Sequence, residues 1–277
     1  MIYKFITNNP ELASYATSCG VHRIFVDMEY LGKDKRQGHL NSHKARHTIE
    51  NVQAIHKAVP ETELMVRINP VYEGTASEVD SVIEAGADLI MLPMFTTAEE
   101  VDTVIKRITG RCRLCLLLET PQALVRLDQI LEHRDKIDEI HIGLNDLHLG
   151  LGLDFMFEVL TGGLIDFVAD RILEADIRFG FGGVARIGEG AVPAEMVLGE
   201  HVRLGSEMVI LSRTFHQNAK SVSELKEMVN LKDEIEKLNR CLNDYKNADQ
   251  SVLDNNRQAI KKSVRSVVTI KKGVTVA

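Results

Sequence analysis

Eight short apolar runs alternate with segments of helical pattern along most of this chain, and this alternation limits the folds it can adopt. The runs are Tyr3–Ile6, Arg23–Met28, Leu64–Ile68, Ala87–Leu92, Leu114–Leu118, Ile140–Leu144, Arg178–Phe181 and Met208–Leu211. Several are continuously apolar, which predicts strands buried on both faces of a parallel sheet. Eight such strands within about 215 residues predict a (β/α)8 TIM barrel, an α/β fold of typically about 250 residues. A doubly wound open sheet is the competing architecture, but the first strand-to-helix turn, TNNPEL, has no dinucleotide fingerprint.

The chain is predicted to have three parts. Residues 1–218 form the barrel, and residues 219–248 form a long helix with a heptad pattern. Such a helix needs a partner surface, on the barrel, on a neighbouring subunit or on its own copy. Residues 249–277 are predicted to be a short β-rich tail, because Ser263–Val276 is rich in β-branched residues.

The composition excludes several classes of protein. The formal net charge of −7 and the pI of about 5.8 argue against a nucleic-acid or anionic membrane surface. No apolar run approaches the roughly 20 residues that cross a bilayer, and the first residues lack the pattern of a signal peptide. The four cysteines are spaced for neither a disulfide framework nor a zinc site. We expect a cytoplasmic protein that binds small molecules and forms a homo-oligomer, possibly through its long helix.

Polar side chains follow several predicted strands at the points where the strands end. The carboxyl ends of barrel strands meet at one rim, where TIM-barrel enzymes hold their active sites. The candidates are Asp27 and Glu29 after the second strand, Arg67 and Asn69 after the third, Glu119 after the fifth, and Asn145 and Asp146 after the sixth. The sequence therefore predicts several acids and at least one arginine at the same rim.

These residue types fit one kind of chemistry. The carboxylates of Glu119 and Asp146, from adjacent strands, are enough to hold Mg²⁺ or Mn²⁺ together with water and an oxygen-rich substrate. An arginine such as Arg67 would neutralise a substrate carboxylate through charge-assisted hydrogen bonds. With the metal as a Lewis acid, the set predicts carbanion chemistry on a 2-oxo acid.

The chain also resembles a known family, in five motifs that occur in the family's order. They are RIFVDMEY, MVRINP, ADLIMLPMFTTAEEV, LLLETPQAL and IHIGLNDLHLGLG. They resemble the pyruvate-type aldolase and citrate lyase beta-subunit family, the HpcH/HpaI group, from roughly Tyr3 to Phe215. The resemblance implies a divalent-metal-dependent carbon–carbon lyase or aldolase. It would cleave or form a bond to pyruvate through a metal-stabilised enolate, with a small or sugar-derived aldehyde as acceptor.

The resemblance also assigns roles to residues. Glu119 and Asp146 match the metal ligands, and Arg67 matches the arginine that binds pyruvate. The catalytic candidates are Arg67, Asp27, Glu29 and His43, and the substrate-binding candidates are Arg67, Asn69, Gly143, Leu144 and Asn145.

The sequence departs from both branches of the family. Aldolases have a histidine acid/base, and citrate lyases an aspartate, at the position of Tyr30, and citrate lyases often have a lysine at the position of Met94. His39 and His43, in the long loop after the second strand, are candidates to replace the missing acid/base, as is a metal-bound water. An acyl-CoA lyase like the citrate lyase beta subunit, and a non-catalytic barrel that binds a 2-oxo acid, are therefore the alternative functions.

Two further patterns remain. The turn FGGVARIGEG around Arg186 is typical either of a phosphate site after the seventh strand, as in a phosphosugar isomerase, or of a tight glycine turn. The end of the chain, KKSVRSVVTIKKGVTVA, is similar to the start of the antifreeze-like domain of sialic acid synthases. Only the first strand or two of that domain are present, which indicates either a shortened form of a longer protein or a remnant.

Overall fold

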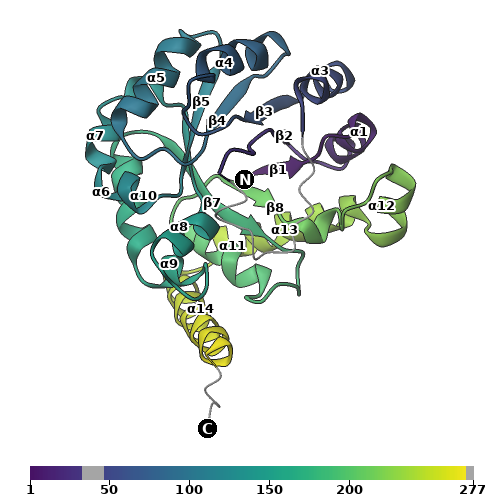
Figure 1. Cartoon of the computed structure of the whole chain (residues 1–277). Helices are drawn as coiled ribbons and strands as arrows, with labels where there is room; N and C mark the ends of the chain where they lie inside the picture. The colour runs from purple at the N-terminus through teal and green to yellow at the C-terminus, as the bar shows by residue number, and fades with distance from the viewer. Residues whose placement is uncertain (33–46, 273–277) are drawn as a thin grey trace.

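The structure is a computed structural model that describes residues 1–32 and 47–272. Within these residues, eight parallel strands close into a barrel in the order of the sequence (Figure 1). The strands are β1 (Ile2–Ile6), β2 (Arg23–Asp27), β3 (Glu63–Arg67), β4 (Leu89–Leu92), β5 (Arg113–Leu118), β6 (Glu139–Ile142), β7 (Arg178–Val184) and β8 (Met208–Leu211). The predicted (β/α)8 barrel is confirmed.

Helices cover the outside of the barrel. They are α1 (Pro10–Ser18), α3 (Ile49–Ala58), α4 (Thr75–Glu84), α5 (Ala98–Ile108), α6 (Pro121–Val125), α7 (Leu127–Leu131), α8 (Leu144–Gly150), α9 (Glu158–Thr161), α10 (Leu164–Glu174) and α11 (Ala194–Arg203), with short 3₁₀ turns η1 (Arg134–Lys136) and η2 (Arg213–Phe215). Their starts follow local rules: Asn9 caps α1 ahead of Pro10, and Thr97 forms a capping box with Glu100 at the start of α5.

The strands are apolar on both faces because both faces are buried. The outward-facing residues pack under the helices in one large core. The inward-facing residues form a second, smaller cluster inside the barrel, which consists of Phe25, Met65, Leu89, Met91, Cys115 and Leu117. None of the helices in the described ranges is long and apolar enough to cross a membrane.

The segment predicted as one long helix, 219–248, is divided in two. These helices are α12 (Val222–Met228) and α13 (Leu231–Lys246), and the side chain of Asn230 caps α13 by accepting a hydrogen bond from Asp233 N–H at 3.3 Å. The apolar seam of α13 is buried, with α13 packed beside α11 of the same chain. Contact with the barrel, one of the partner surfaces predicted for this segment, is therefore present, and contact with another subunit stays a prediction.

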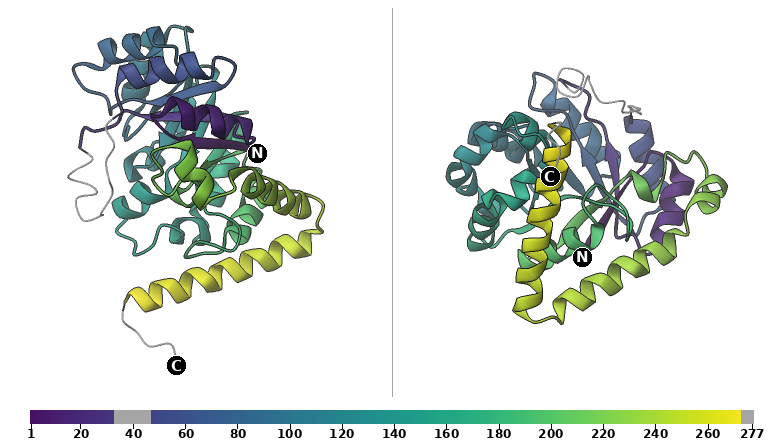
Figure 2. Two further views of the ribbon diagram at one scale, coloured as in Figure 1. Left: turned by 90° about the vertical axis from the view of Figure 1, so that its right-hand side faces the viewer. Right: turned by 90° about the horizontal axis from the view of Figure 1, so that it is seen from below.

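The prediction of a β-rich tail is wrong. Residues Gln250–Lys271 form a single helix, α14, which meets α13 at a corner and runs along one side of the barrel (Figure 2). Asn256, Ile260 and Val264 are buried at a spacing of four residues, which is a helical repeat. The β-branched residues lower helix propensity by only a few tenths of a kcal/mol each, about 0.5 kcal/mol at most, and burial against α11 and α9 outweighs this.

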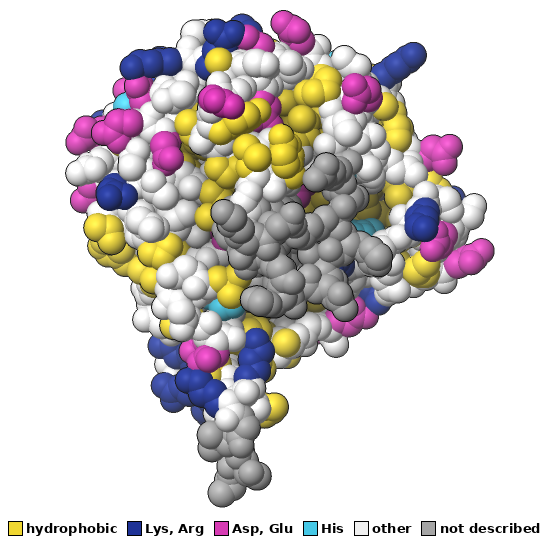
Figure 3. Space-filling view, in the orientation of Figure 1, with side chains coloured by type: hydrophobic (Ala, Val, Ile, Leu, Met, Phe, Trp, Pro, Cys, Tyr) yellow, Lys and Arg dark blue, Asp and Glu magenta, His cyan; other side chains and the backbone are white. Residues whose placement is uncertain are grey.

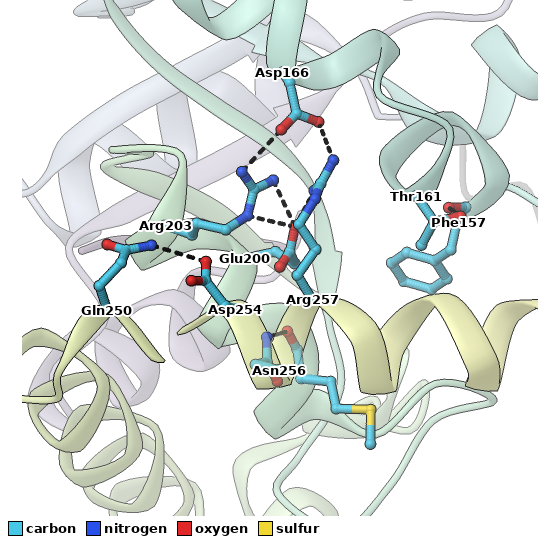
Figure 4. A network of polar contacts seen from close by, with 10 residues as sticks. Phe157, Thr161, Asp166, Glu200, Arg203, Gln250, Asp254, Asn256 and Arg257 are labelled. Carbon is cyan, nitrogen blue, oxygen red and sulfur yellow. Dashed lines mark hydrogen bonds and ion pairs between the residues drawn. The ribbon is translucent and has the colours of Figure 1, made fainter. Parts of the chain in front are cut away.

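Ion pairs fix the first half of α14 to the barrel (Figure 4). Arg257 binds Glu200 of α11 at 2.9 Å and Asp166 of α10 at 2.7 Å. Arg203 binds the same two carboxylates, Asp166 at 2.8 Å and Glu200 at 2.7 Å. Because Glu200 is fully buried, both arginines are needed to balance its charge and that of Asp166.

Candidate active site at the carboxyl ends of the strands

The predicted acids and arginine lie at one end of the barrel. Asp27 ends β2, Arg67 ends β3, Glu119 directly follows β5, and Asp146 lies in the first turn of α8, which follows β6. All four positions are at the carboxyl ends of parallel strands, the end that holds the active site in TIM barrels.

Arg67 and Asp27 form a bidentate ion pair. Arg67 Nε donates to Asp27 Oδ1 at 2.8 Å and Nη2 donates to Asp27 Oδ2 at 2.7 Å. The third nitrogen, Nη1, lies 3.3 Å from Glu29 Oε2. Burial would lower the pKa of Arg67, but Asp27 and Glu29 outweigh it and raise that pKa, so the guanidinium stays charged. Its fork geometry is therefore fixed by the two acids.

Glu119 is a buried carboxyl among like charges. Its side chain is 3% exposed, and Met94 N–H donates to its Oε1 at 3.2 Å. Burial raises the pKa of Glu119 to about 8; Arg67 pulls the pKa down, while the charges of Asp146 and Glu29 push it further up. Asp146 therefore lies within electrostatic reach of Glu119. A cation between these carboxyls would relieve both the burial and the repulsion.

The backbone around Glu119 is closely fitted. Met94 has a φ of 54°, in the left-handed region that costs energy for any residue other than glycine. On the other side, a Cβ at Gly143 would lie 2.7 Å from Glu119 Oε2. Only glycine at 143 leaves the carboxylate in its present position.

The predicted substrate-binding residues Gly143, Leu144 and Asn145 form the start of α8. Gly143 N–H donates to Leu118 O at 3.0 Å, which ties this turn to the end of β5. Leu144 and Asn145 are in the first helical turn, whose N–H groups have no partner within the helix. Such N–H groups can donate hydrogen bonds to a substrate carboxylate.

Asn69 holds the chain after β2. Its Oδ1 accepts from Tyr30 N–H and Leu31 N–H, both at 3.0 Å, and its Nδ2 donates to Glu78 Oε1 at 2.7 Å. These bonds occupy the side-chain amide, so Asn69 shapes the rim through the segment that starts at Tyr30. Its predicted contact with substrate remains a prediction.

The acid/base candidates His43 and His39 lie outside the described residues. A different histidine, His47, reaches the site: its Nδ1 accepts from Asp27 N–H at 2.9 Å. Its other ring nitrogen then carries the proton in the neutral form. The sequence predicts a helix over Lys44–Ala58, so His47 is expected inside a helix and not at the rim; in the structure that helix, α3, begins only at Ile49.

In the glycine turn at the end of β7, the side chain of Arg186 is bound to an acid of the same turn. Arg186 binds Glu189 within the turn, with Nη2 to Oε1 at 2.5 Å and Nε to Oε2 at 3.3 Å. The charge of Arg186 is therefore neutralised locally, and the reading as a tight glycine turn is favoured.

The donor set fits a divalent cation that keeps most of its water. Within residues 1–32 and 47–272, no three His, Cys, Asp or Glu side chains converge on one point as a closed metal cage. Mg²⁺ needs no such cage, because it commonly binds through one or two carboxylates and retains several waters. Glu119 and Asp146 are such a pair, and burial, together with the charge of Asp146, raises the pKa of Glu119 in a way that a nearby cation would offset.

Comparison with known proteins identifies the family. A family profile described as HpcH/HpaI aldolase/citrate lyase matches residues 5–178. The chain belongs to the HpcH/HpaI aldolase/citrate lyase family. Membership indicates an enzyme of the lyase or aldolase type, in a family whose aldolases typically depend on a divalent metal. A comparison with curated proteins gave no match.

Several solved structures share the fold of this chain. An HpcH/HpaI aldolase from Desulfitobacterium hafniense DCB-2 is 17% identical, with a TM-score of 0.60, over 83% of this chain and 94% of the other. An HpcH/HpaI aldolase/citrate lyase family protein from Burkholderia cenocepacia J2315 is 12% identical, with a TM-score of 0.61, over 86% and 94%. The citrate synthase SbnG is 14% identical, with a TM-score of 0.58, over 76% and 86%. At these identities the similarity concerns the fold alone.

Proposed function

We propose that this chain is a divalent-metal-dependent carbon–carbon lyase or aldolase that acts on pyruvate or a related 2-oxo acid. The observation that supports it best is the buried Glu119 within electrostatic reach of the partly buried Asp146, beside the fixed guanidinium of Arg67. Two acids suit a metal, and the arginine suits the carboxylate of the substrate. A small or sugar-derived aldehyde would be the second substrate.

Each residue has a distinct task in this reaction. Glu119 and Asp146 would hold Mg²⁺ or Mn²⁺, which would supply Lewis-acid stabilisation of the negative charge that develops on the ketone oxygen. Arg67, held by Asp27 and Glu29, would bind and orient the substrate. The first-turn N–H groups of α8 would bind its carboxylate.

This sequence has Tyr30 where aldolases of the family have a histidine acid/base. We therefore propose His47 as the residue that transfers the proton. Its imidazole accepts a hydrogen bond from the backbone N–H of Asp27. The carboxylate of Asp27 in turn binds Arg67, the proposed substrate-binding arginine, so Asp27 connects the two residues. A neutral imidazole can donate and accept a proton near pH 7.

Exchange of the methyl protons of pyruvate in D2O, followed by proton NMR, tests the proposal. We expect Mg²⁺- or Mn²⁺-dependent exchange that is lost in Glu119→Gln and Asp146→Asn and kept in Asp154→Asn, an exposed acid near α8. Exchange that is unchanged in both ligand variants would contradict the proposal. Pyruvate binding without exchange would favour the non-catalytic barrel.

One observation favours a second candidate, a lyase that acts on an acyl-CoA thioester. From Arg257 to the C-cap residue Lys272, α14 also carries Lys261, Lys262, Arg265 and Lys271, and it has no acid in this stretch. Lys and Arg side chains gather around the end of α14 (Figure 3), where Lys272 binds Asp154, in the segment after α8. This end could bind the phosphates of CoA beside the rim.

Calorimetric titration with CoA tests the second candidate. We expect the double substitution Lys262→Glu and Arg265→Glu to abolish CoA binding, and Lys232→Glu, on the exposed side of α13, to leave it unchanged. Equal CoA binding by all three proteins, or no binding by the wild type, would exclude a role for α14 in CoA recognition.

A further inference from the structure

A buried lysine and a buried histidine meet inside the barrel, and the proposed reaction uses neither. Lys4 lies on β1 and His141 on β6, with exposed fractions of 0% and 1%. Lys4 Nζ is 3.2 Å from His141 Nδ1, so the two side chains connect strands that are not neighbours in the barrel. A charged amine without such a partner would be costly in this interior.

The protonation of the pair follows from its surroundings. Burial lowers the pKa of Lys4 to about 8, which still leaves the amine protonated at neutral pH. Burial, and then the charge of Lys4, hold the pKa of His141 well below its usual value, so the imidazole is neutral. Lys4 therefore donates to Nδ1, and the proton of His141 is on Nε2.

That proton is directed at a bulge in β7. His141 Nε2 lies 3.0 Å from the carbonyl oxygen of Gly182 and donates to it. Gly180 pairs with Met208 and Gly183 with Ile210, so three steps along β7 face two along β8. Gly182 lies in this bulge with a φ of 49°, a left-handed conformation suited to glycine.

The other side of the bulge contacts the candidate site. A Cβ added to Gly182 would lie 2.9 Å from Leu144 Cδ1, so the backbone of β7 packs directly against Leu144. Leu144 is buried and begins α8, the helix whose first turn contains Asp146. A shift of the bulge would therefore move the start of α8, because packed interiors transmit such shifts.

We propose that Lys4 and His141 are positioning residues, which hold the β7 bulge at Gly182 and, through its contact with Leu144, fix the start of α8. If the proposed function holds, on which this last step rests, they keep Asp146 in position to bind the metal. Their side chains bond to each other and to Gly182 O, and neither is among the residues proposed to bind substrate or metal. Their effect is on the position of Asp146, the proposed metal ligand two residues after Leu144.

Three variants separate positioning from general stability. The double substitution Lys4→Met and His141→Phe removes both polar groups together and leaves no orphaned charge. His141→Gln keeps one donor and one acceptor. Leu89→Ala removes a fully buried side chain from the opposite part of the barrel interior and is the matched destabilising control.

Methyl and amide NMR of the metal-free proteins gives a readout that does not depend on the proposed function. We expect the Leu144 methyl resonances and the Asp146 amide to shift in the double variant, to stay near wild type in His141→Gln, and to stay unchanged in Leu89→Ala. The inference would be overturned if only the resonances around Gly182 shifted and those of Leu144 and Asp146 did not. It would also be overturned if the shifts of Leu144 and Asp146 were equally large in Leu89→Ala.

Mn²⁺ binding, followed by the EPR signal of the free ion, extends the test to the site. The double variant should bind Mn²⁺ about tenfold more weakly, in line with losses of about 10- to 100-fold when residues behind metal ligands are changed. Equal affinity in wild type and double variant would overturn the inference. If the wild type binds no Mn²⁺, the proposed metal function fails, and the NMR comparison alone decides the positioning role.

Discussion

Glu119 is the residue whose environment says most about the site. A carboxyl with its pKa raised to about 8 is largely protonated at neutral pH, yet a metal ligand must be ionised. Below pH 8, therefore, the proposed metal binding would have to displace a proton from Glu119. The affinity for the metal then depends on pH in a direction that can be stated in advance.

We predict that Mn²⁺ affinity increases by about tenfold per pH unit from pH 6 towards pH 8 and then levels off. The sign follows because the proton leaves Glu119 as pH rises through its pKa. EPR titration at several pH values measures this slope. Glu119→Gln, which has no proton to lose, should bind weakly with little pH dependence, and an unchanged slope in that variant would assign the proton to another group.

Arg67 should be sensitive even to a conservative change. Lysine keeps the charge but cannot make two parallel bonds to Asp27 and reach a substrate as well. We expect Arg67→Lys to raise the KM for pyruvate by about 10- to 100-fold, the loss expected for hydrogen bonds to charged groups. Steady-state kinetics measures it, and Arg186→Lys is the matched control. A normal KM in Arg67→Lys would show that the arginine has no role in substrate binding.

Gly143 tests how closely the turn fits Glu119. In Gly143→Ala the added Cβ would lie 2.7 Å from Glu119 Oε2, so the carboxylate must move. We expect at least a tenfold loss of Mn²⁺ affinity, of the size seen when groups that orient metal ligands are changed, roughly 10- to 100-fold. Circular dichroism checks that the variant is folded, and wild-type affinity in a folded variant would contradict the expected displacement.

The sequence predicts the rim residues that follow strands, but not the contacts that cross the chain. The positions of Asp27, Arg67 and Glu119 follow from strand ends and from barrel geometry. The role of Asn69 in holding Tyr30 and the contact of His47 with Asp27 join residues through space. No periodicity in the sequence records such contacts, so the sequence predicts the acid/base at His39 or His43 and not at His47.

At the scale of elements, α14 shows where local propensity fails. The segment Ser263–Val276 contains enough valine and isoleucine to resemble strands, but the spacing of Ile260, Val264 and Val268 is helical. Helix α11 offers a surface for that stripe, and Arg257 finds two carboxylates there. The eight barrel strands were predictable because each has its own apolar run, whereas the state of α14 depends on its neighbours.

The anchoring of α14 can be measured. We expect Arg257→Ala to lower the free energy of unfolding by about 1.5–3 kcal/mol, because a hydrogen-bonded charge is lost beside the fully buried Glu200. Arg265→Ala, on the exposed side of the same helix, should change it by less than about 0.5 kcal/mol. Urea denaturation compares the two, and equal effects would show that α14 contributes no specific ion pair to stability.

For the whole molecule, the barrel divides into a structural interior and a functional rim. Inside, Arg23 binds Glu139 through both oxygens, at 2.6 and 2.8 Å, close to the pair of Lys4 and His141. At the carboxyl ends of the strands, Arg67 is paired with Asp27 and Glu29, and the buried Glu119 lies among further acids. The prediction of a homo-oligomer stays a prediction, with α13 and α14 both packed on their own barrel.

A crystal structure with Mn²⁺ and pyruvate tests the central claim most directly. The anomalous signal of manganese should lie within bonding distance, about 2.0–2.3 Å, of one oxygen each from Glu119 and Asp146. The pyruvate carboxylate should lie against the start of α8 with Arg67 beside the ketone or carboxylate oxygens. A manganese peak away from both acids, or pyruvate bound without contact to Arg67, would contradict the assignment of this rim as a metal-dependent 2-oxo acid site.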